Sequence, residues 1–186
     1  MPTYPIHIHH LFISPGHNYF GHPPGAPGAH PTHAVDAVQA VAGKGLVGDR
    51  FFDVRAGFDG QATFFNWEVY RALADALGGD VPGVAACRRN VILSGVPLNG
   101  LIGHTFEIDF GDGDTVAFLG TKHCAPCRWM DHGFGPGGHA FLKGRGGLRT
   151  QIRGGGVLRI GDAILRTDAV LDLATKTNRL TLPQLP

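Results

Sequence analysis

The chain has 186 residues, 43% of them hydrophobic, and a formal net charge of +1. This length suits one domain with a sizeable core, and the composition excludes a disordered or fibrous protein. The near-neutral charge argues against a general nucleic-acid-binding protein, which normally carries a broad basic excess, so any anionic ligand has to meet a local cluster of cations.

The N-terminal part of the chain is predicted to contain strands and one long loop. The β-branched, partly alternating residues 6–13 indicate a strand. Residues 14–31 are dense in Gly, Pro and His and predict an exposed loop. Residues 35–41 carry valines at helical spacing, but the run is short, so its periodicity leaves helix or strand open. Residues 62–65 predict a further strand.

One helix is predicted directly after that strand. Asn66 is a residue type that favours the N-cap, Glu68 would lie in the first turn, and Gly78 and Gly79 predict the end. Its apolar face would consist of five side chains: Trp67, Tyr70, Leu73, Ala74 and Leu77.

The rest of the chain is predicted to be mostly β. Strands are expected at residues 90–93, 105–108, 115–119, 148–152, 157–160 and 163–166. Gly111–Asp114 fits a hairpin turn between the second and third of these, and residues 139–143 predict a short helix. Many short strands with few helices indicate a barrel or a sandwich. No repeat or domain boundary is evident, so residues 1–186 are expected to form a single domain.

Cellular location is predicted from what the sequence lacks. No apolar run approaches the roughly 20 residues of a membrane-spanning helix, and residues 1–5 lack the basic and apolar regions of a secretory signal. Three cysteines do not favour a disulfide framework, and a reducing cytoplasm is the expected compartment. We therefore expect a cytoplasmic protein that binds neither membranes nor nucleic acid.

Residues 122–132 hold the chain's most reactive chemistry. Two residues separate Cys124 from Cys127, and a lysine, an arginine and two histidines lie around them in the sequence. A thiol reacts or binds metal as the thiolate, which nearby cations favour. The neighbouring proline and glycine residues indicate a turn, in which at least one sulfur faces a cleft. The third cysteine, Cys87, stands alone and is predicted to be a small buried hydrophobe.

The residues themselves leave other interpretations of this segment open. Cys124 and Cys127 have the spacing of half a zinc site, which a histidine from the set His123, His132 and His139 would have to complete. The same spacing occurs in redox pairs of the thioredoxin type, although those occupy a βαβ setting. Cys127 is also compatible with a buried, inert role.

Four segments together resemble the MOSC domain family, named after the C-terminal domain of molybdenum cofactor sulfurases. Residues 43–50 (GKGLVGDR) resemble the family's GxGxxGDR segment, and residues 88–91 (RRNV) with 98–103 (LNGLIG) resemble its second block. Residues 125–127 (APC) resemble its cysteine block, and residues 146–162 its glycine-rich closing block. The segments follow the family's order and cover about residues 6–166, which leaves 167–186 as a C-terminal extension.

The resemblance implies a mostly β, MOSC-type barrel with a few short helices. It also implies binding of the molybdenum cofactor (Moco), a pterin that carries a dithiolene and a phosphate. The role of metal ligand or persulfide sulfur carrier falls on Cys127, and Arg88 and Asn90 match positions that hold the cofactor in relatives. Arg50 closes the first block and is a further expected contact, whereas Cys124 is not part of the family pattern.

Residue chemistry adds two further candidates to this site. On a strand over residues 148–153, Arg149 and Arg153 would lie on one face and could join Arg50, Arg88 and Arg145 in an anion-binding wall. Arg149 and Arg153 fit equally well on the solvated face of an edge strand.

The resemblance predicts a molybdenum-dependent reductase of N-hydroxylated compounds or related small molecules, with molybdenum bound through Cys127. Such a reductase would need an external electron donor, since nothing in the sequence resembles a flavin or iron–sulfur site. The alternative is a non-catalytic sulfur carrier that takes a persulfide on Cys127 from a sulfur donor and delivers it to a partner. A third is a binding or regulatory module that uses no thiol chemistry.

Overall fold

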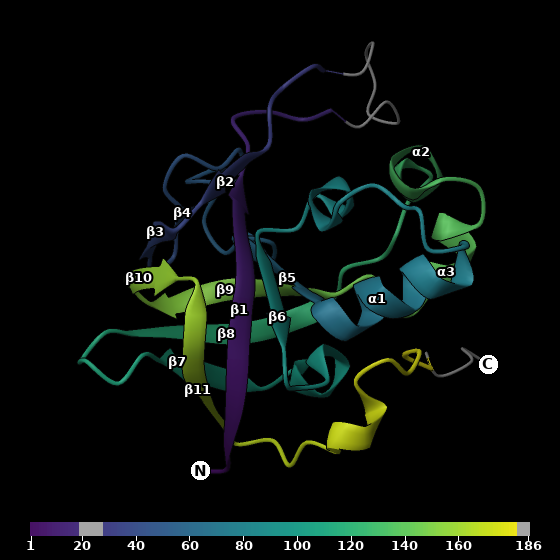
Figure 1. The fold of residues 1–186 in the computed structure, drawn as a ribbon. Coiled ribbons are helices and arrows are strands. Elements are labelled where there is room, and N and C mark those ends of the chain that lie inside the picture. The colour runs from purple at the N-terminus through teal and green to yellow at the C-terminus, as the bar shows by residue number, and fades with distance from the viewer. Residues whose placement is uncertain (19–27, 182–186) are drawn as a thin grey trace, which may run out of the picture.

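The computed structural model describes residues 1–18 and 28–181. Residues 19–27 of the loop predicted at 14–31 therefore lie outside the described residues. Within them, the hydrogen-bonded strands form a closed barrel of seven strands (Figure 1). Around the barrel these are β11 (Gly161–Thr167), β7 (Thr105–Asp109), β8 (Thr115–His123), β9 (Leu148–Gly154), β5 (Ala62–Asn66), β6 (Val91–Ser94) and β1 (Thr3–Ile13), which pairs back onto β11. The predicted mostly β barrel is confirmed.

One pair in the barrel, β5 with β6, is parallel, and the other described barrel pairs are antiparallel. A parallel pair needs a long crossover, which here contains helix α1 (Trp67–Ala76) and the 3₁₀ helix η1 (Val84–Cys87). The predicted helix is confirmed, but the Asn66 side chain does not cap it. Its Nδ2 donates instead to Val96 O at 2.7 Å and ties the helix start to the turn after β6.

The segment that periodicity left undecided is β. His33–Val35 forms β2, which pairs with β1, and Ala37–Val41 forms β3 in a small second sheet with β4 (Gly45–Leu46) and β10 (Gly156–Arg159). Val38 and Ala40 are buried, whereas Ala37 and Gln39, which alternate with them along the strand, are exposed. Burial with a period of two is the strand pattern, so this side-chain alternation decides for a strand.

Aromatic side chains fill the barrel. Phe64, Phe106 and Phe118 are fully buried, and their ring centroids lie 5.1–5.7 Å apart in edge-to-face and stacked pairs. These are the preferred arrangements of aromatic rings. The barrel interior is thus a packed core, and any site has to lie at its rim.

Three short α-helices form a second apolar cluster on the outside of the barrel. Helix α1 packs with α2 (Trp129–Phe134) and α3 (Gly138–Leu142), and Val69, Leu73 and Ile92 are buried between the helices and the barrel. The short helix predicted at 139–143 is therefore confirmed within one residue. None of the described helices is long and apolar enough to cross a membrane.

Strand β8 runs four residues past its predicted end at Leu119. Its start is as expected, since the Gly111–Asp114 turn is closed by a hydrogen bond from Phe110 N to Asp114 O at 3.2 Å. Gly120 lies within the strand because the backbone carbonyl of Leu101 occupies the space that a Cβ would need. This close approach lets β8 continue to His123 and carry the cysteine segment to the barrel rim.

The residues after β11 fold back over the molecule. Leu171 N donates to Tyr4 Oη at 2.8 Å, η3 (Leu173–Thr175) follows, and Leu180 N donates to Gly144 O at 2.8 Å. The 3₁₀ helix η2 (Leu98–Leu101) lies beside this segment, where Asn99 Nδ2 also donates to Gly144 O at 3.0 Å.

Candidate functional site

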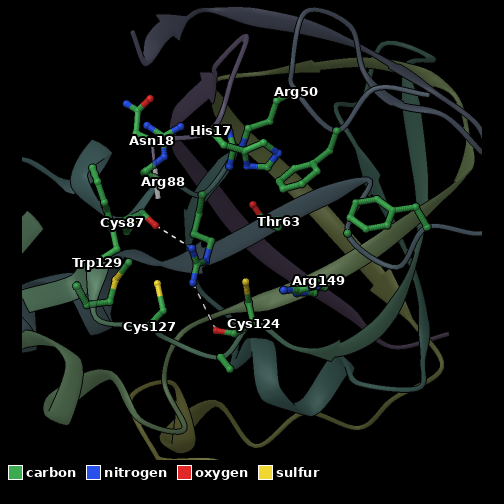
Figure 2. Close-up of a pocket in the computed structure, with 16 residues that line it drawn as sticks. His17, Asn18, Arg50, Thr63, Cys87, Arg88, Cys124, Cys127, Trp129 and Arg149 are labelled. Carbon is green, nitrogen blue, oxygen red and sulfur yellow. Dashed lines mark hydrogen bonds between the residues drawn. The ribbon is translucent and has the colours of Figure 1, made fainter. Parts of the chain in front are cut away.

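A cavity of about 270 Å³ opens at the barrel rim, where the first glycine-rich block, the η1–β6 connection and the cysteine segment meet (Figure 2). Its volume is near the lower end of the range of ligand pockets. The three blocks are far apart in sequence. The residues that line the cavity and matter to the argument are Arg50, Phe51, Phe58, Cys87, Arg88, Arg89, Cys124, Cys127, Trp129 and Arg149.

All three cysteines of the chain line this cavity. Cys127 is partly exposed, Cys124 is 5% exposed and Cys87 is 1% exposed. Cys87 is buried, as predicted, but it is part of the cavity wall rather than an isolated core residue. Burial raises the pKa of the Cys87 thiol to about 11, so this sulfur remains protonated at neutral pH.

The backbone on both sides of the cysteine pair is held in place. Cys124 N donates to Gly147 O at 2.8 Å, which fixes it to the start of β9, and Met130 N donates to Cys127 O at 2.9 Å, where α2 begins. A Cβ on Gly146 would collide with Cys124 O. The closing glycine block therefore has no side chain here because the cysteine segment packs directly against its backbone.

Arg88 enters the cavity from the end of η1, where its backbone is left-handed with a φ of 54°. Its Nη2 donates to Ser14 Oγ at 3.2 Å and to Gly16 O at 3.0 Å, and its guanidinium carbon lies 5.6 Å from the Trp129 ring centroid. Burial lowers the pKa of Arg88, and the nearby Asp49 carboxylate acts in the opposite direction. The charge is thus held half-buried and in a fixed position.

Arg89 is the site residue that sequence analysis missed as a contact, since a single arginine is most often a solvated surface charge. Its guanidinium donates to three backbone carbonyls: Gly146 O at 3.1 Å, Cys87 O at 2.8 Å and Cys124 O at 3.5 Å. Within residues 1–18 and 28–181 it forms no ion pair, so its positive charge remains available to a ligand. Its position next to Arg88 in the second block was the one sequence signal.

Arg50 also lines the cavity, and its side chain is 10% exposed. Burial lowers its pKa, Asp49 raises it, and Arg88 and Arg89 lower it further. Asp49 is its ion-pair partner, at 3.4 Å from Arg50 Nη1 to Asp49 Oδ2. The Asp49 carboxylate also acts on Arg88, whereas Arg89 forms no ion pair within residues 1–18 and 28–181, so the cavity is a positive site in a nearly neutral chain.

Asn90 lies behind this cluster and does not line the cavity. It is 2% exposed, and its Nδ2 donates to Asp49 Oδ2 at 3.0 Å and to Phe12 O at 3.1 Å. Its Oδ1 accepts from both the backbone and the hydroxyl of Thr63. Because every polar atom of its side chain is used, Asn90 acts on the cavity through Asp49, which in turn holds Arg50.

The predicted arginine wall forms only in part. Arg149 lines the cavity and pairs with Asp59 at 3.4 Å. Arg153 shares its strand face but is exposed and lies away from the cavity, because four residues along a strand span about 13 Å. Arg145 points elsewhere and donates to Thr177 O and Phe141 O. Arg89 lines the cavity, whereas Arg145 and Arg153, which the sequence analysis assigned to the wall, do not.

Aromatic rings complete the cavity wall. The centroids of Phe51 and Phe58 are 5.3 Å apart, and Trp129 lies beside Arg88. The cavity thus combines flat apolar surfaces, cations and a partly exposed thiol. This combination suits a planar ligand that carries an anionic group and an atom with affinity for sulfur.

The zinc interpretation finds no support in residues 1–18 and 28–181, where no group of three or more His, Cys, Asp or Glu side chains is placed to hold a metal ion. His123 is partly buried, and neither of its ring nitrogens has a hydrogen-bond partner there. Burial and the nearby Arg89 lower the pKa of its imidazole, which favours the neutral ring.

Three solved structures resemble this one over most of the chain. The YuaD protein from Bacillus subtilis has a TM-score of 0.67 and 17% sequence identity, over 89% of this chain and 97% of that one. The chain has the fold of YuaD and YiiM. YiiM from Escherichia coli has a TM-score of 0.59 and 16% identity, over 95% of this chain and 75% of YiiM. YiiM from Geobacillus stearothermophilus has a TM-score of 0.58 and 14% identity, over 90% and 75%.

At these identities the likeness to YuaD and YiiM shows a common fold. No protein-family model and no curated protein sequence matches the chain.

Proposed function

We propose that the chain is a MOSC-domain protein that binds the molybdenum cofactor in the cavity at the barrel rim. The observation that carries this proposal is the meeting of Cys127 with Arg50, Arg88 and Arg89 around one cavity. The four motif blocks in family order and the fold shared with YuaD and YiiM support it.

The residues present fit this cofactor by the chemistry of their donors. Molybdenum in a dithiolene site is soft enough to prefer thiolate, and Cys127 supplies a partly exposed sulfur. Guanidinium groups bind phosphate oxygens bidentately, and Arg50, Arg88 and Arg89 would hold the pterin phosphate. The Phe51 and Trp129 rings would cover a flat heterocycle. Bound Moco would supply two-electron redox chemistry at the cavity.

The side chains of this protein would bind the cofactor, orient it and shield it. Asn90 and Asp49 keep Arg50 in place, and three backbone carbonyls hold the Arg89 guanidinium in a fixed position. Since these contacts exist before any ligand arrives, little ordering remains to be done on binding. The substrates proposed are N-hydroxylated or related small molecules, reduced in the cytoplasm with electrons from an external donor.

The second candidate function is that of a sulfur carrier with a persulfide on Cys127. The observation that favours it is the second thiol, Cys124, in the same cavity. Nearby guanidinium groups would stabilise a persulfide anion as well as a thiolate.

The test of cofactor binding is to produce the protein in a host that makes Moco and to measure molybdenum and pterin per chain. We expect both in the wild type, loss of molybdenum in Cys127→Ser, and reduced pterin in Arg89→Gln. Arg153→Gln is the matched control, because this arginine lies on β9 but away from the cavity. Wild-type protein without molybdenum and pterin, or equal loss in Arg153→Gln, would contradict the proposal.

A further inference from the structure

The cavity contains one thiol that the family resemblance does not account for. Cys127 belongs to the motif, but Cys124 also lines the cavity, and Figure 2 shows the sulfurs of both residues pointing into it. The two differ in access, since Cys127 is partly exposed and Cys124 is 5% exposed. An incoming reagent therefore meets Cys127 first, with Cys124 behind it.

The two cysteines have the sequence spacing of a redox pair and lie on the same cavity. Two residues separate them, as in the redox motifs in which neighbouring thiols form a disulfide. Cys124 is held by the Gly147 carbonyl and Cys127 by the first turn of α2, so only Ala125 and Pro126 lie between two fixed points. Because α2 begins after the second cysteine, the setting differs from the βαβ arrangement of thioredoxin-type pairs.

Two arginines lie near Cys124. The Arg89 guanidinium donates to its carbonyl at 3.5 Å, and Arg50 lies close enough that a charge on the Cys124 sulfur raises the pKa of Arg50. A thiolate is the attacking species in thiol exchange, and neighbouring cations increase its fraction. Cys87 shares the cavity, but its pKa of about 11 keeps it protonated.

We propose that Cys124 is a resolving thiol that releases sulfide from a persulfide held on Cys127. The Cys124 thiolate attacks the inner sulfur of the persulfide, a Cys124–Cys127 bond forms, and the bond to the outer sulfur breaks. The outer sulfur leaves as hydrosulfide with the bonding electron pair, so it is reduced while the two cysteines are oxidised to a disulfide. The proton of the Cys124 thiol passes to solvent. A low-molecular-weight persulfide supplies the sulfur, and an external dithiol restores both thiols.

This inference rests on the proposed function in one respect, the assignment of Cys127 as the thiol that receives the ligand or sulfur. It does not depend on Moco binding. The experiment therefore uses the full chain produced without Moco, reduced, freed of reductant and exposed to glutathione persulfide.

Three readouts follow the reaction: intact mass, sulfide trapped with a bimane reagent, and tryptic mapping. Trypsin cleaves after Lys122 and Arg128, which leaves both cysteines in the peptide of residues 123–128 and Cys87 in another. We expect the wild type to release one sulfide per chain and to lose the mass of two hydrogens in that peptide. Cys124→Ser should keep one added sulfur on Cys127 and release at least tenfold less sulfide. Arg153→Gln, a substitution away from the cavity, is the control and should behave as the wild type.

Sulfide release by Cys124→Ser at the wild-type rate would overturn the inference, and so would a disulfide that maps to Cys87. Loss of the added sulfur in Cys127→Ser is expected and shows that the reaction begins there. If molybdenum and pterin fail to bind while sulfide release depends on Cys124, the cofactor proposal falls and this inference stands. If molybdenum and pterin bind but sulfide release does not depend on Cys124, the cofactor proposal stands and this inference falls.

Discussion

Arg159 of β10, which contacts the β7–β8 hairpin, and the arginines at the cavity have opposite electrostatic surroundings. At the hairpin, Arg159 contacts two carboxylates, Asp112 and Asp114, so its charge is more than matched. At the cavity, Arg50 and Arg88 share the carboxylate of Asp49, and Arg89 forms no ion pair within residues 1–18 and 28–181. Both regions belong to a chain with a net charge of +1. Overall charge therefore says little about a binding site, because pairing elsewhere leaves a local excess unbalanced.

The largest effect expected from this difference is on stability. Asp49→Asn would leave the Arg50 guanidinium buried without an ionic partner, and breaking a buried pair in this way costs about 3–5 kcal/mol. Urea unfolding followed by circular dichroism measures the free energy of unfolding. Asp114→Asn at the hairpin is the matched control, and its effect should be far smaller. Equal effects of the two substitutions would show that the cavity carboxylate has no special role.

The next largest effect concerns the buried thiol in the cavity wall. The pKa of Cys87 is about 11 in the folded protein and lower, near the usual thiol value, once the chain unfolds. Between these two pKa values the Cys87 thiol is deprotonated in the unfolded state and still protonated in the folded state. The free energy of unfolding therefore falls as pH rises from about 9 to 11. We expect the wild type to lose up to about 3 kcal/mol over this interval through Cys87.

Cys87→Ala removes this contribution, so its free energy of unfolding should fall less steeply with pH than that of the wild type. The measurement is urea unfolding at several alkaline pH values. Parallel curves for the two proteins would contradict the buried, protonated state of Cys87.

A smaller effect is expected on anion binding. Arg89→Gln removes a charged donor that forms no ion pair within residues 1–18 and 28–181, and a hydrogen bond to a charged group is worth about 1.5–3 kcal/mol. Affinity for inorganic phosphate should fall about tenfold to a hundredfold. Trp129 lies at the cavity wall, so its fluorescence is a suitable readout. Arg159→Gln should bind phosphate as the wild type does, and a matching loss there would indicate non-specific attraction.

The smallest effect is expected at the hairpin itself. Arg159→Gln removes contacts to Asp112 and Asp114 that lie at the surface, where water and salt screen them. The thermal midpoint should stay within the error of the wild-type value, and any change should disappear in high salt. A large, salt-resistant loss would show that the hairpin arginine stabilises the barrel as strongly as Asp49 stabilises the cavity.

Local sequence signals predicted the helices, strands and turns well where the conformational preference of the residues themselves decides the structure. Alternating burial, the glycine–aspartate turn and the apolar face of α1 all express such preferences, and each appears where expected. The predicted strand ended at Leu119, one residue before Gly120, and glycine normally weakens a strand. In the fold Gly120 is required by the Leu101 carbonyl, a contact that no local pattern reveals.

The sequence by itself determined the mostly β architecture, because strand periodicity and glycine-rich turns are local properties of the chain. The segments that meet at the cavity were expected only from the resemblance to the MOSC family. Tertiary structure alone decided which side chains face the cavity. Cys87 and Arg89 line the cavity, Arg153 does not, and Asn90 lies behind the lining, where it donates to Asp49. The physical reason is that barrel closure brings segments about 80 residues apart into contact, and the direction of each side chain at that meeting depends on neighbours from other segments.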